Sequence, residues 1–259
     1  MTSSTPSAAA PPMATSQRLL PGRTEVKTPS TELVTWFDFT GGSLEDKVPA
    51  PRGTMKRLVT LLPGAVVDPD TKSFLEVDGR GQNYNSGKQT AKIDRAAGFA
   101  IPEFSVSLFY FIEYLYGGGA TGSQTCSWQR ILTNQVFSFE MNACAYPKPY
   151  IRGGPIKFDG AGIGTPKVWT HIALTRSPTE TKLYFRGALV GTAPSPPLPA
   201  NPEEHASLGT SLYGAVDDFR FYRGVLDATA IAALAQAGPS IGKPVASSTA
   251  PTTAPVLAK

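Results

Sequence analysis

Residues Val168 to Ala193 read VWTHIALTRSPTETKLYFRGALVGTA, which is the pattern of two β-strands joined by a short turn. Val168–Arg176 and Lys182–Phe185 are rich in β-branched and aromatic residues, the types that favour strands. Similar short runs recur on both sides of this stretch: Leu33–Phe39, Phe74–Val77, Phe104–Ile112 and Val216–Tyr222. Gly, Pro, Asn and Asp separate the runs, so the pattern predicts an all-β, two-sheet antiparallel sandwich.

One stretch near the C-terminal end is predicted to be a helix. Ala228–Gln236 reads ATAIAALAQ and consists mostly of helix-forming residues. Asp227 can cap its first turn, and Gly238 followed by Pro239 ends it. We therefore expect one short helix after the last strand.

Two low-complexity segments flank the predicted sandwich. Residues 1–30 and 239–259 are rich in Ser, Thr, Ala and Pro and lack the bulky apolar residues that a core requires. We predict an N-terminal arm over 1–30, one sandwich domain over 31–238 and a C-terminal arm over 239–259. The arms are expected to be either flexible or ordered by neighbouring subunits.

The excess positive charge lies in these arms. The chain has 24 Lys and Arg against 20 Asp and Glu, a formal net charge of +4. Five of the basic residues but only one acidic residue lie in the arms, which leaves the central domain neutral. Because no basic cluster is interleaved with aromatic residues, nucleic-acid binding is not predicted.

Other classes of protein are excluded by equally simple features. No apolar run reaches the roughly 20 residues that span a bilayer, so no membrane-spanning helix is expected. The first residues lack a basic start followed by an apolar stretch, so we predict no secretory signal peptide. Two Cys and two His are too few for a zinc cluster or a dense disulfide framework.

The segment CSWQRILTNQVFSFEMNAC, from Cys126 to Cys144, fits a β-hairpin with a three-residue turn at 134–136. That register makes four cross-strand pairs: Cys126 with Cys144, Gln129 with Met141, Arg130 with Glu140, and Ile131 with Phe139. The register permits a disulfide between Cys126 and Cys144. Reduced thiols are the alternative in a cytosolic setting.

Three segments, taken in order, resemble the laminin-G-like, concanavalin A-like jelly rolls. Glu32–Asp46 (ELVTWFDFTGGSLED) resembles the opening strand of that family. Val168–Ala193 resembles its hairpin, and Tyr213–Leu234 its closing strand, Gly-x-Ile-Asp-Asp-x-Arg-x-Tyr, with the helix that follows. The hairpin motifs Trp-x-His and Leu-Tyr-x-x-Gly are matched at Trp169, His171, Leu183, Tyr184 and Gly187. The resemblance implies two packed sheets with jelly-roll connections, and another kind of sandwich is the alternative.

Catalysis is not predicted, although the family includes glycosidases beside glycan-binding modules, adhesion domains and structural parts of virions. A glycosidase needs two carboxyl groups at the scissile bond, and the β-glucanases of this fold carry Glu-x-Asp-x-x-Glu on one strand. The nearest strand here, Phe137–Ala143, offers only Glu140, which we interpret as the partner of Arg130. We interpret His171 as structural. The sequence therefore predicts a protein that is not an enzyme.

The resemblance also implies a structural Ca²⁺ ion. Related sandwiches hold it with an Asp at the position of Asp217 and with backbone carbonyls near the opening strand, where Asp38 and Asp46 also lie. Thr40 stands where the family has the Asp of Phe-Asp-Gly, which removes one ligand. By strand alternation Asp217 shares a face with two phenylalanines, so it needs compensation if that face is buried. The alternative is that Asp217 accepts hydrogen bonds from backbone amides or pairs with an arginine.

Four aromatic residues are candidates for ligand binding, because exposed aromatic rings can stack on sugars or on a protein partner. They are Trp128, Tyr84, Tyr146 and Tyr150. Trp128 lies on the polar face of the predicted hairpin, and the alternative is that a loop of the domain itself covers it.

These observations predict a non-catalytic structural and adhesive component of a larger assembly, such as a virion or another extracellular particle surface. The arms would contact protein neighbours in a homo- or hetero-assembly, and the loops would bind a glycan or a protein. A monomeric carbohydrate-binding module is the alternative, and a divergent glycosidase is the third possibility.

Overall fold

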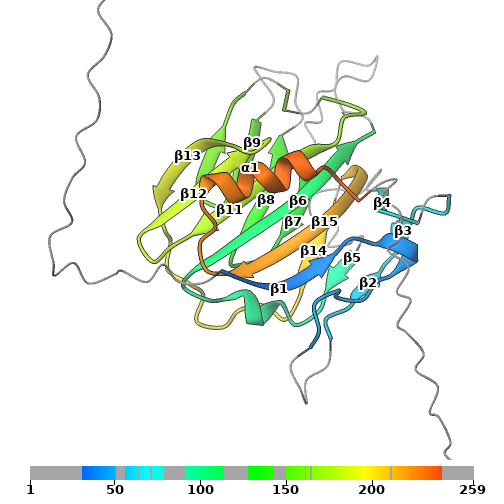
Figure 1. Ribbon diagram of the computed structural model, residues 1–259, viewed down its shortest axis with the longest axis horizontal. Helices are drawn as coiled ribbons and strands as arrows, with labels where there is room; N and C mark the ends of the chain where they lie inside the picture. The colour runs from blue at the N-terminus through cyan, green and yellow to red at the C-terminus, as the bar shows by residue number, and fades with distance from the viewer. Residues whose placement is uncertain are drawn as a thin grey trace, which may run out of the picture.

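Two antiparallel sheets face each other in the computed structural model of this chain (Figure 1). The structure describes residues 31–50, 56–63, 65–70, 72–78, 91–113, 128–142, 150–160, 162–163, 165–210 and 212–240. Cys126 and Cys144 lie outside these ranges, as do the predicted arms apart from Pro239 and Ser240. The disulfide and the domain boundaries therefore stay predictions.

The first sheet has eight strands in the order β13-β12-β11-β6-β15-β4-β3, with β1 also paired to β15. Their bounds are β1 Glu32–Phe37, β3 Ala65–Val67, β4 Leu75–Asp78, β6 Phe104–Ile112, β11 Thr170–Arg176, β12 Glu180–Phe185, β13 Ala188–Pro194 and β15 Tyr213–Arg223. Strands far apart in the chain are neighbours here, since β6 lies between β11 and β15. The predicted strand Phe104–Ile112 matches β6 at both ends.

The second sheet has seven strands in the order β10-β9-β8-β7-β14-β5-β2. Their bounds are β2 Val59–Leu61, β5 Ala91–Ile93, β7 Trp128–Thr133, β8 Ser138–Asn142, β9 Tyr150–Gly153, β10 Ile156–Phe158 and β14 Ala206–Leu208. Two short 3₁₀ helices, η1 (Thr40–Gly42) and η2 (Ala96–Phe99), lie in the connections. The fold class is the predicted two-sheet sandwich.

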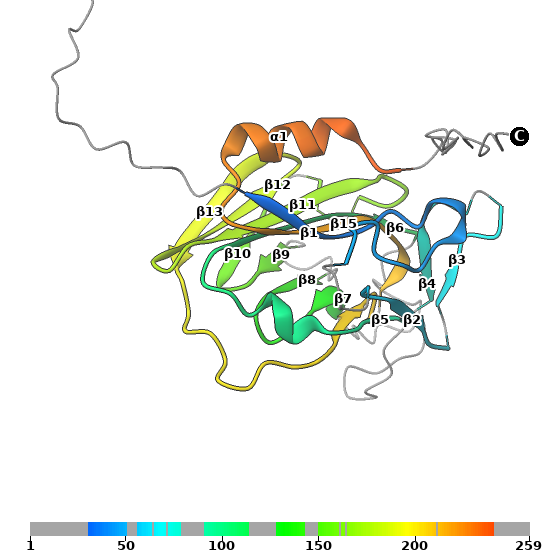
Figure 2. The same ribbon diagram turned by 60° about the horizontal axis from the view of Figure 1, so that its bottom comes forward.

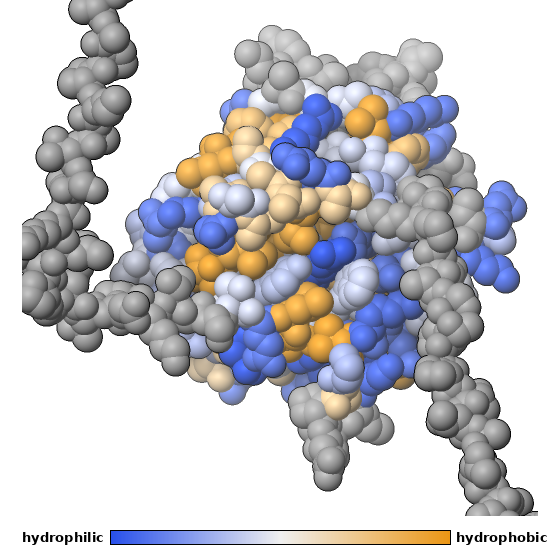
Figure 3. All heavy atoms as spheres, in the orientation of Figure 1, coloured by the Kyte–Doolittle hydropathy of each residue, from blue (hydrophilic) through white to orange (hydrophobic). Residues whose placement is uncertain are grey.

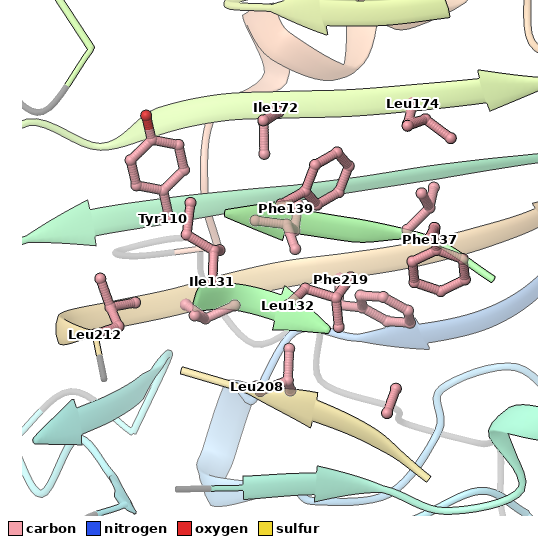
Figure 4. Packing of buried hydrophobic residues seen from close by; sticks show 14 of the residues in the cluster. Tyr110, Ile131, Leu132, Phe137, Phe139, Ile172, Leu174, Leu208, Leu212 and Phe219 are labelled. Atoms are coloured by element: carbon pink, nitrogen blue, oxygen red, sulfur yellow. The ribbon is translucent and has the colours of Figure 1, made fainter. Parts of the chain in front are cut away.

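Side chains from the inner faces of both sheets fill one apolar core (Figure 4). Ile172 and Leu174 of β11 project into it from one sheet, and Ile131 and Phe139 of β7 and β8 from the other. Burial of such alternating aliphatic and aromatic side chains is the main force that holds a sandwich together. The core therefore accounts for the regular alternation along the longer strands.

The predicted hairpin between β7 and β8 forms, but with a correction to its register. Gln129 pairs with Met141, and Arg130 pairs with Glu140, as predicted. The register then shifts between Arg130 and Leu132, so that Leu132, not Ile131, pairs with Phe139. The extra residue of this bulge was not visible in the sequence, because alternation alone assumes an unbroken ladder.

A second bulge corrects the predicted face of Asp217. The register of β15 against β6 shifts between Asp217 and Arg220, and Asp218 has a left-handed φ of 52°. Val216 and Phe219 both pack in the core, so Asp217, the neighbour of Val216, lies on the opposite, outer face. Strict alternation predicted that Asp217 shares a face with Phe219 and Phe221. The bulge instead places Asp217 on the face opposite to these two side chains.

The same bulge joins the opening and closing strands of the domain. Asp218 accepts a hydrogen bond of 2.6 Å from Trp36 Nε1 and forms an ion pair of 2.9 Å with Arg220. The side chain of Asp218 is almost fully buried, so this charge needs both partners. The bond explains in physical terms why the Trp-containing and the Asp-Asp-containing segments occur together.

One helix, α1 (Ala228–Ala237), lies across the outer face of the eight-stranded sheet (Figure 2). Asp227 caps it as predicted, since its carboxylate accepts a bond of 2.8 Å from the amide of Ala230. Ile231 is fully buried against the outer face of this sheet, where it packs with Ala173 and Tyr184. In the described part of the chain no helix is long and apolar enough to cross a bilayer.

Gly187, in the turn between β12 and β13, allows this helix to lie close to the sheet. Its φ is +82°, a region that favours glycine. A Cβ atom there would lie 3.0 Å from Ala235 Cβ and 3.2 Å from Ala232 Cα. The glycine is therefore required both by the turn and by the helix above it.

Candidate functional site

A row of charged side chains crosses the outer face of the seven-stranded sheet. The register aligns Arg130 of β7, Glu140 of β8, Arg152 of β9 and Lys157 of β10 on adjacent strands. Arg130 Nε lies 3.6 Å from Glu140 Oε1, so the predicted ion pair is confirmed. In this row three cationic side chains accompany one carboxylate.

Aromatic positions lie in the adjacent register row. Trp128 pairs with Asn142, and Asn142 pairs with Tyr150 on the next strand. Tyr150 is half-buried, and Lys157 Nζ lies 4.1 Å from the centroid of its ring. Such a cation–π contact holds the ring and the ammonium group in fixed positions. The structure thus brings Tyr150 beside the charged row.

The side chains of the other three candidate aromatic residues lie outside the described part of the structure. The backbone of Trp128 belongs to β7, but its side chain is outside what the structure describes. Tyr84 and Tyr146 lie wholly outside the described residues. Their predicted roles in ligand binding stay predictions.

A cleft with a volume of about 370 Å³ opens beside the charged row. Polar and charged side chains from β7, β8, β14 and their connections line it, among them Arg130, Asn134, Ser138, Glu140, Glu203 and Ser207. Hydroxyl, amide and charged groups that converge on one hollow can hydrogen-bond a ligand rich in hydroxyl groups. The cleft is therefore suited to a polar ligand.

Asn134 fixes the turn between β7 and β8 that forms one wall of this cleft. Its Oδ1 accepts a bond of 2.8 Å from the amide of Val136, and its Nδ2 donates to the carbonyl of His205 at 3.3 Å. An Asn side chain that bonds the backbone two residues later is typical of a tight turn. The wall is thus built from the turn predicted at 134–136.

A second cavity, of about 220 Å³, lies at the end of the sandwich between the two sheets. It is lined by Arg176, the last residue of β11, and by the β7–β8 turn that also borders the cleft. Arg176 is only 5% exposed, and its Nε is buried without a hydrogen-bond partner. Burial lowers the pKa of the Arg176 guanidinium.

Sequence reasoning missed Arg176, although a signal was present. Ile172 and Leu174 project into the core, and Arg176 follows them in the same two-residue phase. A charged residue at the third core-facing position of an apolar strand predicts an unusual environment.

Backbone amides of the protein donate hydrogen bonds to both carboxylate oxygens of Asp217. Its Oδ1 accepts the amide of Asp218 at 2.6 Å, and its Oδ2 accepts the amide of Ser240. Burial raises the pKa of Asp217 to about 7, and the nearby carboxylates of Asp218 and Asp38 act in the same direction. This geometry agrees with the backbone-amide alternative for Asp217.

The carboxylates near Asp217 also have protein partners. Asp38 pairs with Lys47 at 3.2 Å, so its carboxylate also has a protein partner. Asp46 accepts the amides of Trp36 and Val48. Among the described residues no group of three or more His, Cys, Asp or Glu side chains is placed to hold a metal ion. Calcium binding at Asp217 and Asp38 stays a prediction that metal titration can test.

His171 lies on the other face of the molecule, under α1. Its Nε2 lies 2.9 Å from Ser107 Oγ, and its ring packs edge-on against Phe109 with centroids 5.1 Å apart. Burial lowers the pKa of His171 to about 4, and the positive charge of Arg220 adds to this effect. A neutral, hydrogen-bonded and buried imidazole agrees with the structural interpretation.

Comparison with known proteins bears on the fold. The family model of the concanavalin A-like lectin/glucanase superfamily matches residues 121–232, which is less than half of the chain. No curated protein matches the sequence.

Solved structures with the same fold include binding domains of botulinum neurotoxins. The binding domain of serotype D is 12% identical with a TM-score of 0.57, and 79% of this chain covers 51% of that chain. The serotype DC binding domain, solved in complex with rat synaptotagmin II, is 13% identical with a TM-score of 0.58 over the same shares. Another structure of the DC domain, in complex with SialylT, has a TM-score of 0.55 at 13% identity, again over 79% of this chain and 51% of that one.

The present chain thus spans about half the length of these binding domains, and at this identity the likeness concerns the fold. The superfamily name covers both lectins and glucanases, so it does not separate binding from hydrolysis. The family match includes Val168–Ala193 and most of Tyr213–Leu234, whereas Glu32–Asp46 lies outside it. The described part of the chain has the two-sheet jelly-roll fold of the concanavalin A-like proteins.

Proposed function

We propose that this jelly roll is a non-catalytic adhesive domain that binds a glycan on the outer face of its seven-stranded sheet. The observation that carries the proposal is the polar cleft beside the row from Arg130 to Lys157. Protein-bound sugars are held by converging hydrogen-bonding groups together with an aromatic ring. Here Ser138, Glu140 and Ser207 line the cleft and supply the polar groups. Tyr150, which lies beside the charged row but does not line the cleft, supplies the ring.

The experiment is a glycan array followed by calorimetry with the best-binding glycan. Replacement of Tyr150 by Ala is expected to weaken binding about tenfold or more, because it removes the aromatic contact surface. Lys157→Ala is expected to weaken binding less, because it removes only the contact with the ring. Lys182→Ala is the matched control, since Lys182 is a partly exposed lysine of β12 on the opposite sheet. Equal affinity of Tyr150→Ala and the native protein would contradict the proposal.

We further propose that the domain works within a larger assembly, in which the segments before residue 31 and after residue 238 contact protein neighbours. The composition of these segments and their share of the positive charge support this proposal. Light scattering of the full chain tests it, with a discrete oligomer as the expected result. A monomer that still binds a glycan would instead favour the independent carbohydrate-binding module.

A divergent glycosidase is the second candidate function, and one observation favours it. Glu140 and Glu203 both line the cleft, and two carboxyl groups in one cleft are the minimum for glycoside hydrolysis. Against this stands the ion pair of Glu140 with Arg130. If the protein releases reducing sugar from a β-glucan and Glu203→Gln abolishes this release, the protein is a glycosidase and the non-catalytic proposal is wrong.

A further inference from the structure

In the part of the chain that the structure describes, no opposing charge faces the guanidinium of Arg176 in the end cavity. The residue is 5% exposed, its Nε has no partner, and the residues that line the cavity include no Asp or Glu. Two other arginines of the described chain that are shielded from solvent do face carboxylates. Arg220 lies 2.9 Å from Asp218, and Arg130 lies 3.6 Å from Glu140.

An uncompensated buried charge is costly for the folded protein. Such a group commonly marks a place where a ligand supplies the missing charge, because function rather than stability then explains its retention. The planar guanidinium with its fork of N–H donors matches a carboxylate, which it can bind through two parallel hydrogen bonds. The guanidinium in this cavity is therefore suited to bind a carboxylate group.

The walls of the cavity define the rest of the ligand. Phe104 and Phe137 supply aromatic surface, while Asn134, Ser138 and Thr181 supply polar groups. Aromatic faces and hydrogen-bonding groups together suit a sugar ring, which has apolar C–H faces and a polar rim. A volume of about 220 Å³ is smaller than the pockets of roughly 300–1,000 Å³ that take drug-sized ligands, so it suits one monosaccharide unit.

The end cavity and the cleft on the seven-stranded sheet adjoin. Asn134, Gln135 and Ser138 of the β7–β8 turn line both of them. One chain of sugars can therefore place one unit in the cleft and the next in the end cavity.

We propose that the Arg176 cavity is a subsite for a hexuronic acid unit, whose carboxylate pairs with the Arg176 guanidinium. The proposal rests on the proposed glycan-binding function and names the class of glycan, an acidic polysaccharide or oligosaccharide.

Titration by ¹H–¹⁵N NMR tests the subsite with four probes: glucuronate, galacturonate, glucose and acetate. At least one hexuronate is expected to shift the backbone amides of residues 134–138 and of Arg176, while glucose and acetate leave them unchanged at the same concentration. If neither hexuronate shifts these amides, or if acetate shifts them as much as a hexuronate does, the subsite is disproved.

Variants of Arg176 separate a ligand-binding role from a structural role. Arg176→Met is expected to weaken hexuronate binding at least about tenfold, the size of effect typical of a lost charge-assisted hydrogen bond. Its melting temperature should equal or exceed that of the native protein, because the variant removes an unpaired buried charge. Arg176→Lys should restore part of the binding through its charge. Arg223→Met is the control, since Arg223 is an exposed arginine that pairs with Glu32.

Failure of this inference is distinguishable from failure of the proposed function. If Tyr150→Ala abolishes glycan binding and Arg176→Met does not change it, the hexuronate subsite is wrong and the binding function stands. If Arg176→Met lowers the melting temperature and keeps the hexuronate affinity, Arg176 is structural and the subsite is again wrong. If no glycan binds to the native protein, both proposals fail.

Discussion

The outer faces of the two sheets differ in what covers them and in where their charges lie. The eight-stranded sheet carries α1, and apolar residues gather around this helix on the face seen in Figure 3. Beneath α1 lies a neutral, buried His171, and the buried Asp217 accepts the amide of Ser240, which follows this helix. The seven-stranded sheet instead presents partly exposed ion pairs such as Arg130–Glu140. The comparison shows that the outer face of one sheet is covered and packed, whereas the outer face of the other leaves polar side chains partly exposed.

Loss of the helix contact should have the largest effect. Replacement of Ile231 by Ala is expected to lower the free energy of unfolding by about 2–4 kcal/mol, because the side chain of Ile231 is fully buried between α1 and the sheet. Urea unfolding measures this change. The control Gln236→Ala, on the exposed part of the same helix, should stay within about 0.5 kcal/mol of the native protein. A mild effect of Ile231→Ala would show that the helix does not stabilise the sheet beneath it.

The pH dependence of stability should reveal the buried groups of the covered face. The pKa of His171 is lowered from 6.5 to about 4 in the fold, so the unfolded chain binds the proton first on acidification. This histidine therefore makes the protein less stable as the pH falls from about 6.5 to about 4. The pKa of Asp217 is raised from 3.8 to about 7, so its contribution is present at low pH and is lost as the pH rises through about 7.

The two contributions oppose each other, and single variants should separate them. Asp217→Asn removes the aspartate contribution, so between pH 4 and 6.5 its stability should rise more steeply with pH than that of the native protein, by at most about 1.4 kcal/mol per pH unit. His171→Gln removes the histidine contribution, so its slope over this range should be less positive than the native slope. Thermal unfolding at a series of pH values provides the measurement. If both variants change the native slope in the same direction, this assignment of the buried charges is refuted.

A smaller loss is expected from the turn beneath the helix. Gly187→Ala should cost about 2 kcal/mol, from the positive φ and from the contact of the new methyl group with Ala232 and Ala235. Gly41→Ala is the matched control, since Gly41 has a φ of +69° and open space around its Cα. That variant should cost only about 1 kcal/mol. Chemical denaturation of both variants isolates the contribution of helix packing, and equal losses would argue against the close approach of α1.

The smallest change in stability is expected on the open face. Glu140→Gln should alter the free energy of unfolding by about 0.5 kcal/mol or less, because an ion pair near solvent contributes little. Glycan affinity should nevertheless fall, since Glu140 lines the cleft. Glu180→Gln, which breaks the 2.8 Å pair with Lys182 on the other sheet, should leave binding unchanged. Calorimetry with both variants tests this division between stability and binding.

The longer strands and the helix could be predicted from the sequence because their apolar patterns are long enough to be read. Phe104–Ile112 matches β6, and Asp227 caps α1 as expected. The three-residue strands β2, β3, β5, β10 and β14 were missed, because so short a run carries no periodicity. The two bulges were not predicted either, because the left-handed backbone at Asp218 depends on its tertiary partners Trp36 and Arg220.

The site could be predicted only where its parts lie in one hairpin. The pair Arg130–Glu140 follows from a register count within a single segment. The lack of a partner for Arg176 among the described residues is different, because it depends on which side chains several distant parts of the chain bring to one end of the sandwich. Such an absence is a property of the folded molecule and leaves only a faint trace in the order of residues.

Strand β15 anchors the described chain at both of its boundaries. Glu32, at the beginning of β1, pairs with Arg223, while the amide of Ser240 bonds the side chain of Asp217. A pulling force applied between the segments that precede and follow the domain would therefore act on a single strand, β15. Hydrogen bonds to β6 hold this strand in the middle of the sheet. A domain tethered in this way can bear a pulling force without passing the load through the face that carries the cleft.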